Sequence, residues 1–217
     1  AVQEVGHLPI NVKEQNIDMM SASAHKFHGP KGIGFLYARK GILLSNIIEG
    51  GAQERGKRAV TENIPAIVGM AAALKDVLAH QKENAEKMTA LRDSLIEGLL
   101  TIPHSKLNGD RTKRLPGNVN FCFEGIEGES LLLMLDMKGI AASSGSACTS
   151  GSLDPSHVLL AIGLPHEIAH GSLRLTLSAE TTMEQIDFTV DCLKKIVERL
   201  RSMSPLYEDY IKKHPQQ

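Results

Sequence analysis

Apolar residues recur at helical spacing through the middle of the chain, at Ile67, Met70, Leu74, Val77, Leu78, Met88, Leu91, Leu95 and Leu99. The pattern runs from Pro65 to Pro103, is interrupted around residues 81–83, and predicts one long helix with a kink at the interruption. About 36 residues at roughly 1.5 Å each would span on the order of 50 Å, more than a compact domain needs. We therefore expect the helix to join two lobes, with a domain boundary near its end that separates residues 1–102 from 103–217.

Shorter apolar stretches predict strands in both lobes. Residues 17–20 and 33–37 flank a Gly/Pro/Lys-rich loop, Ser21–Gly32, and are typical of buried strands. In the second lobe apolar and polar residues alternate through 118–123, which predicts a strand with one buried face. Cys122 should then lie on the opposite face.

The rest of the second lobe is predicted to contain a few strands with helices packed on one side. Residues 131–137 form an apolar stretch typical of a short helix, and strands are expected at 140–142 and 172–178. A capping-box pattern at 181–184 predicts a terminal helix that runs to about Met203. We expect the remaining residues to be frayed.

The composition is that of a soluble globular chain, with 217 residues, 42% hydrophobic residues, a net charge of -1 and a pI near 6.8. This charge gives no general attraction to nucleic acid or anionic lipid, so we predict no nucleic-acid partner and no membrane partner. The charge runs at 194–195 and 198–201 are expected on a solvated helix face. Cys122, Cys148 and Cys192 are too widely spaced for a disulfide framework or a zinc site, so no metal is predicted and a reducing, cytoplasmic location is expected.

One cysteine stands among small polar residues. Cys148 lies in the run Ser-Ser-Gly-Ser-Ala-Cys-Thr-Ser-Gly over residues 143–151. A buried structural cysteine has apolar neighbours, whereas a reactive one needs access and room to move. We therefore expect Cys148 to be a mobile nucleophile, and Cys122 and Cys192 to be packed or half-exposed residues of a strand and a helix.

The loop Ser21–Gly32 is a second candidate for chemistry. Its hydroxyl and imidazole groups can bond phosphate oxygens, and its Lys26 stands where an amine could form a Schiff base. Taken alone, such a loop is more often a solvated turn, and its spacing does not fit a Walker motif.

Several motifs in one order resemble those of a known family. They are Ser-Ala-His25-Lys26-x-x-Gly-Pro-Lys-Gly, Arg-Ala-Val-Thr61-Glu-Asn, Ser-Ser-Gly-Ser-Ala-Cys148-Thr-Ser and Ala-His170-Gly-Ser-Leu-Arg174. From residue 1 to about residue 208 the chain resembles the NifS/IscS-type cysteine desulfurases of the class-V aminotransferases, and the NifS-like branch in particular.

The resemblance implies an α/β fold of the pyridoxal-phosphate (PLP) transferases, the aspartate aminotransferase fold type I. Residues 1–102 would be the C-terminal part of the large domain, and 103–217 the small α+β domain that carries the cysteine loop. The implied reaction removes sulfur from L-cysteine to give L-alanine and an enzyme persulfide, which donates sulfur for iron–sulfur cluster assembly.

The resemblance also implies roles for residues around pyridoxal 5'-phosphate. Lys26 would attach the cofactor and then move the Cα proton of the substrate. Ser23 and His25 would hold the phosphate, and Gln3 would bond the phenolic oxygen of the ring. Thr61 would reach the phosphate site of a partner subunit, which implies a homodimer.

Two further roles concern substrate and product. Arg174 would bind the substrate carboxylate, because a guanidinium offers two parallel donors; its position alone fits a surface ion pair equally well. Cys148 would attack the substrate sulfur as a thiolate and carry the persulfide to an iron–sulfur scaffold of the NifU/IscU type or another sulfur acceptor.

Family members carry roughly as much chain again before the point that matches residue 1, and that part supplies much of the cofactor site. We therefore expect the 217 residues to be inactive in isolation. Two alternatives stay open: a non-catalytic fragment that acts as a binding module, and a lyase for selenocysteine or cysteine sulfinate.

Overall fold

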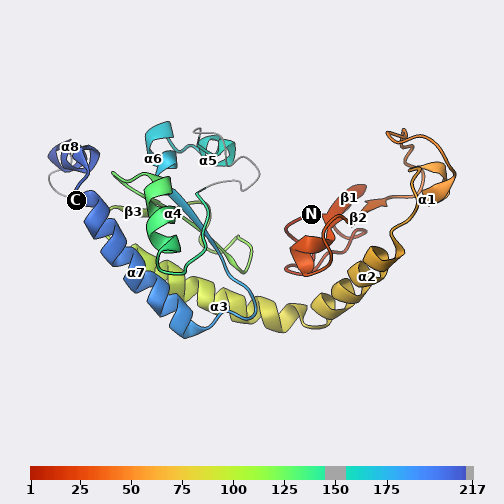
Figure 1. Cartoon of the computed structure of the whole chain (residues 1–217), viewed down its shortest axis with the longest axis horizontal. Coiled ribbons are helices and arrows are strands. Elements are labelled where there is room, and N and C mark those ends of the chain that lie inside the picture. Colours follow the sequence, from red (N-terminus) through yellow and green to blue (C-terminus); the bar gives the residue numbers. More distant parts are fainter. Residues whose placement is uncertain (145–154, 214–217) are drawn as a thin grey trace. The chain divides into compact units, whose positions relative to one another are not determined.

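The computed structural model describes residues 1–144 and 155–213. The chain divides into two compact units, Ala1–Asn84 and Ala85–Gln217 (Figure 1). The elements of the first unit are β1 (Met19–Ser23), the 3-10 helix η1 (Ala24–Phe27), β2 (Gly34–Ala38), α1 (Gln53–Gly56) and α2 (Ile64–Ala79).

The two strands predicted for the first lobe are present and form an antiparallel pair, but they are not buried as predicted, since Met19 is 52% and Leu36 57% exposed. Their register runs from Met19 opposite Ala38 to Ser23 opposite Gly34. The backbones approach so closely at this end that a Cβ on Gly34 would lie 2.3 Å from the carbonyl oxygen of Ala22. The strand pair therefore fixes the position at which η1 begins.

A small core holds η1 against α2. Ala24 and Phe27 of η1 are buried together with Val5 of the N-terminal segment and Val77 of α2. The turn that follows β1 is thus fixed by apolar packing as well as by the strand pair.

The predicted long helix is two helices. α2 ends at Ala79 and α3 (Gln81–Leu100) begins after His80, whose backbone angles (φ -108, ψ 5) interrupt the helix. The apolar residues of α3 are buried in the core of the second unit, and the two compact units meet in the sequence between Asn84 and Ala85, inside α3.

The second unit is built around a three-stranded antiparallel sheet in the order β3-β4-β5. Its elements after α3 are β3 (Ser105–Leu107), β4 (Asn118–Phe123), α4 (Gly128–Asp136), α5 (His157–Ala161), α6 (His166–His170), β5 (Ser172–Thr176), α7 (Met183–Arg201) and α8 (Pro205–Lys213).

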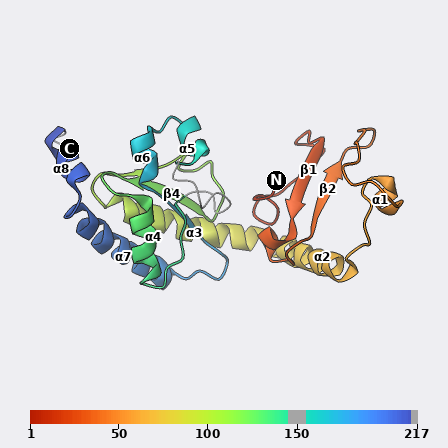
Figure 2. The ribbon, with the colours of Figure 1, turned by 45° about the horizontal axis from the view of Figure 1, so that its top comes forward.

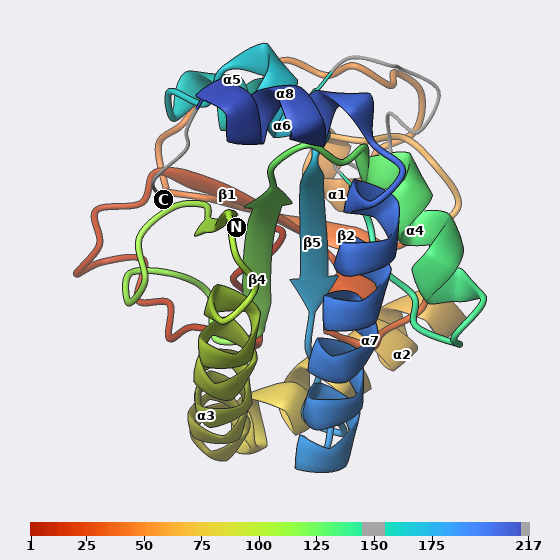
Figure 3. The same ribbon diagram turned by 90° about the vertical axis from the view of Figure 1, so that its left-hand side faces the viewer.

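The larger core lies on one face of this sheet. Val119, Phe121 and Phe123 of β4 and Leu173 of β5 are at most 1% exposed and pack with α3, α4 and α7. Figure 3 looks onto this face, with α3 and α7 in front of β4 and β5. The alternating pattern at 118–123 therefore predicted the strand correctly.

The opposite face of the sheet is covered by α5 and α6. Cys122, predicted to lie on this face, packs with Leu159 of α5 and with Leu164 and Ala169. Within the second unit, α5 and α6 lie on the other side of the sheet from α3 and α7 (Figure 2). The prediction that helices cover only one side is therefore wrong, because short helices bury the second face.

Three predictions for the second lobe differ from the structure: a strand, the position of a capping box and the C-terminal residues. Residues 140–142 form no strand, and only Ser143 bridges to β5. The capping box is formed one residue later than predicted: the Thr182 hydroxyl accepts a bond from the Gln185 N–H, and the Gln185 side chain accepts one from the Thr182 N–H. The predicted frayed end contains α8, which begins where the Ser204 hydroxyl accepts a bond from the N–H of Tyr207.

Replacing a core residue of α3 should test this packing. We expect Leu95→Ala to lower the free energy of unfolding by about 2–5 kcal/mol, because Leu95 is 1% exposed and its loss leaves a cavity. Leu100→Ala on the same helix, where the side chain is 43% exposed, should cost less than about 1 kcal/mol. Urea unfolding followed by circular dichroism measures both; equal losses would contradict the described core.

Candidate functional site

Lys26 stands on a turn whose backbone is fixed at both ends. In η1 the buried residues Ala24 and Phe27 enclose His25 and Lys26, which are exposed. The Ala24 N–H donates to the carbonyl of Ile33 (3.0 Å), and the Ala24 carbonyl accepts from the N–H groups of the two residues that follow η1. The predicted lysine is therefore accessible on a rigid support.

Ser23 and His25 lie together beside Lys26. The Ser23 hydroxyl and the Nδ1 of His25 are 2.9 Å apart. The turn also needs Gly29, because a Cβ there would lie 2.9 Å from the Cβ of Ala24. A hydroxyl, an imidazole and an ammonium on one short turn form a donor set that suits the oxygens of an anion such as phosphate.

Gln3 is exposed on a turn-rich segment that packs into the same core. Val5 is buried with Phe27, and a Cβ on Gly6 would lie 2.8 Å from Val77. In this segment His7 is half-buried. The pKa of His7 is lowered mainly by this burial and to a smaller extent by the charge of His28. The fold thus brings the segments of Gln3 and Lys26 onto one support.

Thr61 is exposed in the segment that leads into α2. Asn63 caps this helix, since its side-chain oxygen accepts a bond from the N–H of Ala66 at 3.2 Å. Val77, which packs against Phe27, belongs to the last turn of the same helix. Thr61 therefore lies at the end of α2 away from that contact.

Arg174 occupies the centre of β5 in the second unit. On one side its backbone is opposite Asn120 of β4, and on the other it forms an isolated antiparallel bridge with Ser143. The N–H of Ser143 donates to the Arg174 carbonyl at 3.1 Å, and the Arg174 N–H donates to the Ser143 carbonyl at 2.6 Å. Since directly opposed residues share a face, Asn120, Arg174 and Ser143 lie in a row across one face of the sheet.

The segment that leads to Cys148 is held at the same strand. The hydroxyl of Ser172, two residues before Arg174, donates to the carbonyl of Ser144 at 2.7 Å. Cys148 itself lies outside the described residues. Its segment nevertheless begins against the strand that carries Arg174, which sequence spacing alone did not predict.

Cys122 shares this face but is a packed thiol. It is 1% exposed, and its burial raises the pKa of the thiol. The Asn108 side-chain amide donates to the Cys122 sulfur at 3.1 Å and to the side-chain oxygen of Asn120 at 2.6 Å. Cys192 is also buried, so the prediction that both cysteines are packed is confirmed. Sequence reasoning missed Asn108 and Asn120, although Asn120 follows the period-two pattern of β4.

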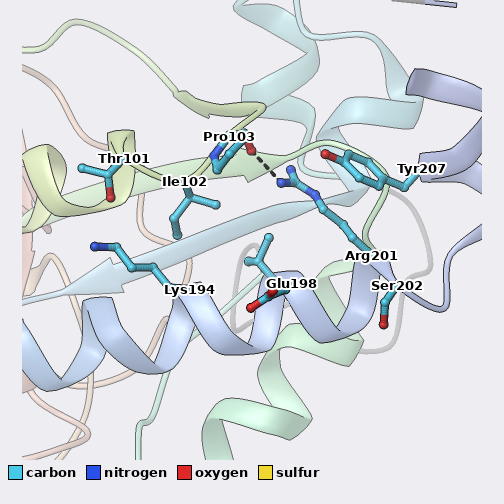
Figure 4. A pocket seen from close by; sticks show the side chains of 9 residues that line it. Thr101, Ile102, Pro103, Lys194, Glu198, Arg201, Ser202 and Tyr207 are labelled. Carbon is cyan, nitrogen blue, oxygen red and sulfur yellow. Dashed lines mark hydrogen bonds between the residues drawn. The ribbon is translucent and has the colours of Figure 1, made fainter. Parts of the chain in front are cut away.

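A groove in the second unit lies apart from the predicted site residues. Figure 4 shows it between the end of α3, α7 and α8, lined by Thr101, Ile102, Pro103, Lys194, Val197, Glu198, Arg201, Ser202 and Tyr207.

The guanidinium in this groove is structural. Arg201 is 7% exposed and donates to the backbone carbonyls of Pro103 (2.6 Å), His104 (3.0 Å) and Glu124 (3.0 Å). Its guanidinium also lies over the Tyr207 ring, 4.5 Å from the centroid, and burial lowers the pKa of Arg201. The prediction that the charge run at 198–201 is solvated is therefore wrong for Arg201, because backbone carbonyls replace its hydration.

Residues 1–144 and 155–213 contain neither a cluster of metal ligands nor a membrane-spanning helix. No group of three or more His, Cys, Asp or Glu side chains in these residues could hold a metal ion. None of the helices described is long and apolar enough to cross a membrane.

Comparison with known proteins identifies the family. The model of the aminotransferase class-V family matches residues 1–188. The chain belongs to this family. It is 58% identical over 215 residues to "Cysteine desulfurase IscS" of Clostridium botulinum strain Hall, covering 98% of this chain and 54% of that protein. It is 56% identical to "Cysteine desulfurase IscS" of Methanosarcina thermophila, covering 95% of this chain and 51% of that protein.

Solved structures agree with this relationship. One called "NIFS-LIKE PROTEIN" is 36% identical with a TM-score of 0.82, over 92% of this chain and 51% of that one. A NifS-like protein from Rickettsia africae is 29% identical with a TM-score of 0.83, over 91% of this chain and 52% of that one. The predicted fold class and the resemblance to NifS/IscS-type proteins are thereby confirmed. This class-V family is one of PLP-dependent enzymes.

The chain spans about half the length of the curated relatives it matches. This chain therefore corresponds to one part of the relatives' fold.

Arg201→Lys should expose the structural role of the guanidinium. We expect it to lower the free energy of unfolding by about 2–4 kcal/mol, because one ammonium cannot satisfy three buried carbonyl groups in the same geometry. Arg199→Lys, at an exposed position two residues earlier, is the matched control and should change stability by less than about 0.5 kcal/mol. Urea unfolding compares the two variants; an equally mild effect of both would contradict the assignment.

Proposed function

We propose that this chain forms part of a PLP-dependent cysteine desulfurase. The enzyme takes sulfur from L-cysteine, leaves L-alanine, and stores the sulfur as a persulfide on Cys148. The observation that carries the proposal is the bridge between Ser143 and Arg174, which ties the segment leading to the cysteine to the strand of Arg174, the residue that would bind the substrate carboxylate. It is supported by the 58% identity to a protein named cysteine desulfurase IscS.

The donors on the first unit fit the cofactor. Ser23 and His25 would bond its phosphate, Gln3 its phenolic oxygen, and Lys26 would attach it through Nζ. When bound, pyridoxal phosphate supplies an electron sink for charge that develops on the substrate carbons. The exposed Nζ of Lys26, on its fixed turn, would then take the proton from the cysteine Cα and return one to the product.

The second unit would supply substrate recognition and sulfur transfer. The two parallel donors of the Arg174 guanidinium match the two oxygens of the cysteine carboxylate. The thiolate of Cys148 attacks the substrate sulfur, so that an S–S bond forms while the C–S bond breaks. The electron pair of the broken bond stays on carbon, which takes up a proton to complete alanine, and no external oxidant is needed. Cys148 lies four positions after Ser144 in the chain, a span of at most about 14 Å.

Activity would need the other half of the family fold, whether it belongs to this polypeptide or to another. The exposed apolar side chains on both strands of the first unit, Met19 (52% exposed) and Leu36 (57%), support this, because such a surface suits a covered position. Residues 1–102 would then belong to the large domain and 103–217 to the small domain.

We further propose a cytoplasmic homodimer. Its Thr61 would reach the phosphate in the partner subunit, in keeping with its exposed position in the segment that leads into α2. Its persulfide would pass to an iron–sulfur scaffold of the NifU/IscU type or to another sulfur acceptor.

Variants of two residues should separate the two halves of the chemistry in the complete enzyme. Cys148→Ala should keep the visible absorbance of the bound cofactor but abolish persulfide, because the acceptor thiol is missing. Lys26→Ala should lower alanine formation by at least about a thousandfold, because covalent attachment and proton transfer are lost together. Absorption spectra, alanine release and protein mass measure these effects.

Lys31→Ala, at an exposed position of the same loop, is the control for Lys26 and should retain activity. Persulfide that survives Cys148→Ala would contradict the assignment of the nucleophile. An assembled protein that binds no cofactor would favour the binding module. Faster turnover of selenocysteine or cysteine sulfinate would favour the corresponding lyase.

Arg174→Lys should weaken recognition of the cysteine carboxylate. We expect kcat/KM for cysteine to fall by about ten- to a hundredfold, because a lysine cannot make the two parallel bonds of a guanidinium. The control is Arg111→Lys, since Arg111 pairs with Glu97 on the surface of the same unit. Steady-state alanine release measures both; an unchanged kcat/KM in Arg174→Lys would show that Arg174 makes a surface contact only.

A further inference from the structure

The last described residue before the cysteine segment, Ser144, is held from two sides. The Ser172 hydroxyl bonds its carbonyl at 2.7 Å, although the two residues lie 28 positions apart in the chain. From the other side, Gly128 at the start of α4 packs against its side chain. These contacts come from β5 and α4, both elements of the core.

The hydroxyl of Ser172 forms its hydrogen bond on the side of β5 that does not pair with β4. The residue is 1% exposed and lies opposite Cys122 of β4, so the backbone of β4 already holds one edge of β5. Its hydroxyl bonds Ser144, on the segment beyond the other edge. An Ala in this place would fill nearly the same volume but would leave the Ser144 carbonyl without this donor.

Gly128 provides the space that this contact requires. A Cβ on Gly128 would lie 3.0 Å from the Cβ of Ser144 and 2.9 Å from the carbonyl oxygens of both His170 and Ser172. Real Cβ atoms rarely approach so closely, so a larger residue would force either the backbone at His170 and Ser172 or the segment of Ser144 to shift. The start of the cysteine segment is therefore confined between α4 and β5.

The hydroxyl bond of Ser172 is also next to the only backbone bridge described between this segment and β5. Within residues 1–144 and 155–213, that bridge joins Ser143 to Arg174 alone. A single bridge outside a strand gives little stability by itself, so an additional bond one residue later should help to keep it formed. Ser172 and Arg174 also share a face of β5, since they are two residues apart.

We propose that Ser172 is a positioning residue for sulfur transfer. Its hydroxyl fixes the point at which the segment of Cys148 leaves the sheet, and so fixes that point relative to Arg174, which would hold the substrate. The proposal rests on the proposed function. Ser172 does not touch the reacting atoms; it acts on Cys148 through Ser144, and its loss should slow the formation of the persulfide without weakening the binding of cysteine.

The test is Ser172→Ala in the complete, cofactor-loaded enzyme, with two readouts. In single-turnover experiments, persulfide on Cys148 should form about tenfold more slowly, while the KM for cysteine and the absorbance of the cofactor stay within about twofold of the unmodified enzyme. In hydrogen exchange, the amide protons of Ser143 and Arg174 should exchange about five- to tenfold faster, because the bridge opens more often.

Ser105→Ala is the matched control, because the Ser105 hydroxyl donates to the Leu99 carbonyl at 2.9 Å elsewhere in the same unit. It should leave the persulfide rate and both amide protons unchanged. Gly128→Ala should reproduce the slow persulfide step by crowding Ser144 from the other side.

The possible results separate the two proposals. An unmodified enzyme that makes no alanine from cysteine would overturn the proposed function. An active enzyme in which Ser172→Ala changes neither the persulfide rate nor the exchange of Ser143 would overturn the role of Ser172 alone. Equal slowing by Ser105→Ala would also overturn it, because the effect would then reflect general loss of stability.

Discussion

The antiparallel pairing along β5 is the interaction on which the second unit depends. One edge of this strand is bonded to β4, and its other edge is bonded to Ser143. Its alternating side chains face two different environments: Leu173 and Leu175 enter the large core, while Ser172 and Arg174 face the other side. A single strand of five residues thus links the main hydrophobic core to the polar row that the proposed function uses.

In the first unit a shorter element, η1, holds the candidate residues in place. η1 has only four residues, two of which are buried and two exposed. Because Ala24 and Phe27 fix the turn, His25 and Lys26 are presented without ordering a long loop. Such an arrangement suits the role proposed for Lys26, which would hold a cofactor and move a proton at one place, since less conformational entropy is lost when the site is already fixed.

Much of the fold could be predicted from the sequence because its signals are local. The alternation through β4 placed Val119 and Phe121 on one face and Cys122 on the other, and the structure agrees. The helix α6 was missed because five residues are too few to show a helical period. The burial of Arg201 was missed because its partners, such as the carbonyl of Glu124, lie 77 residues away and leave no local pattern.

By itself, the sequence determined the family and the chemical types of the candidate residues, because motifs such as Ser-Ala-His25-Lys26 and His170-Gly-Ser-Leu-Arg174 are contiguous and need no fold to be recognised. Only the tertiary structure decided that the segment before Cys148 is attached beside Arg174, through Ser143 and through the hydroxyl of Ser172. The physical reason is that hydrogen bonds between segments distant in the chain depend on strand register and on the space left by residues such as Gly128, which become defined only when the core packs.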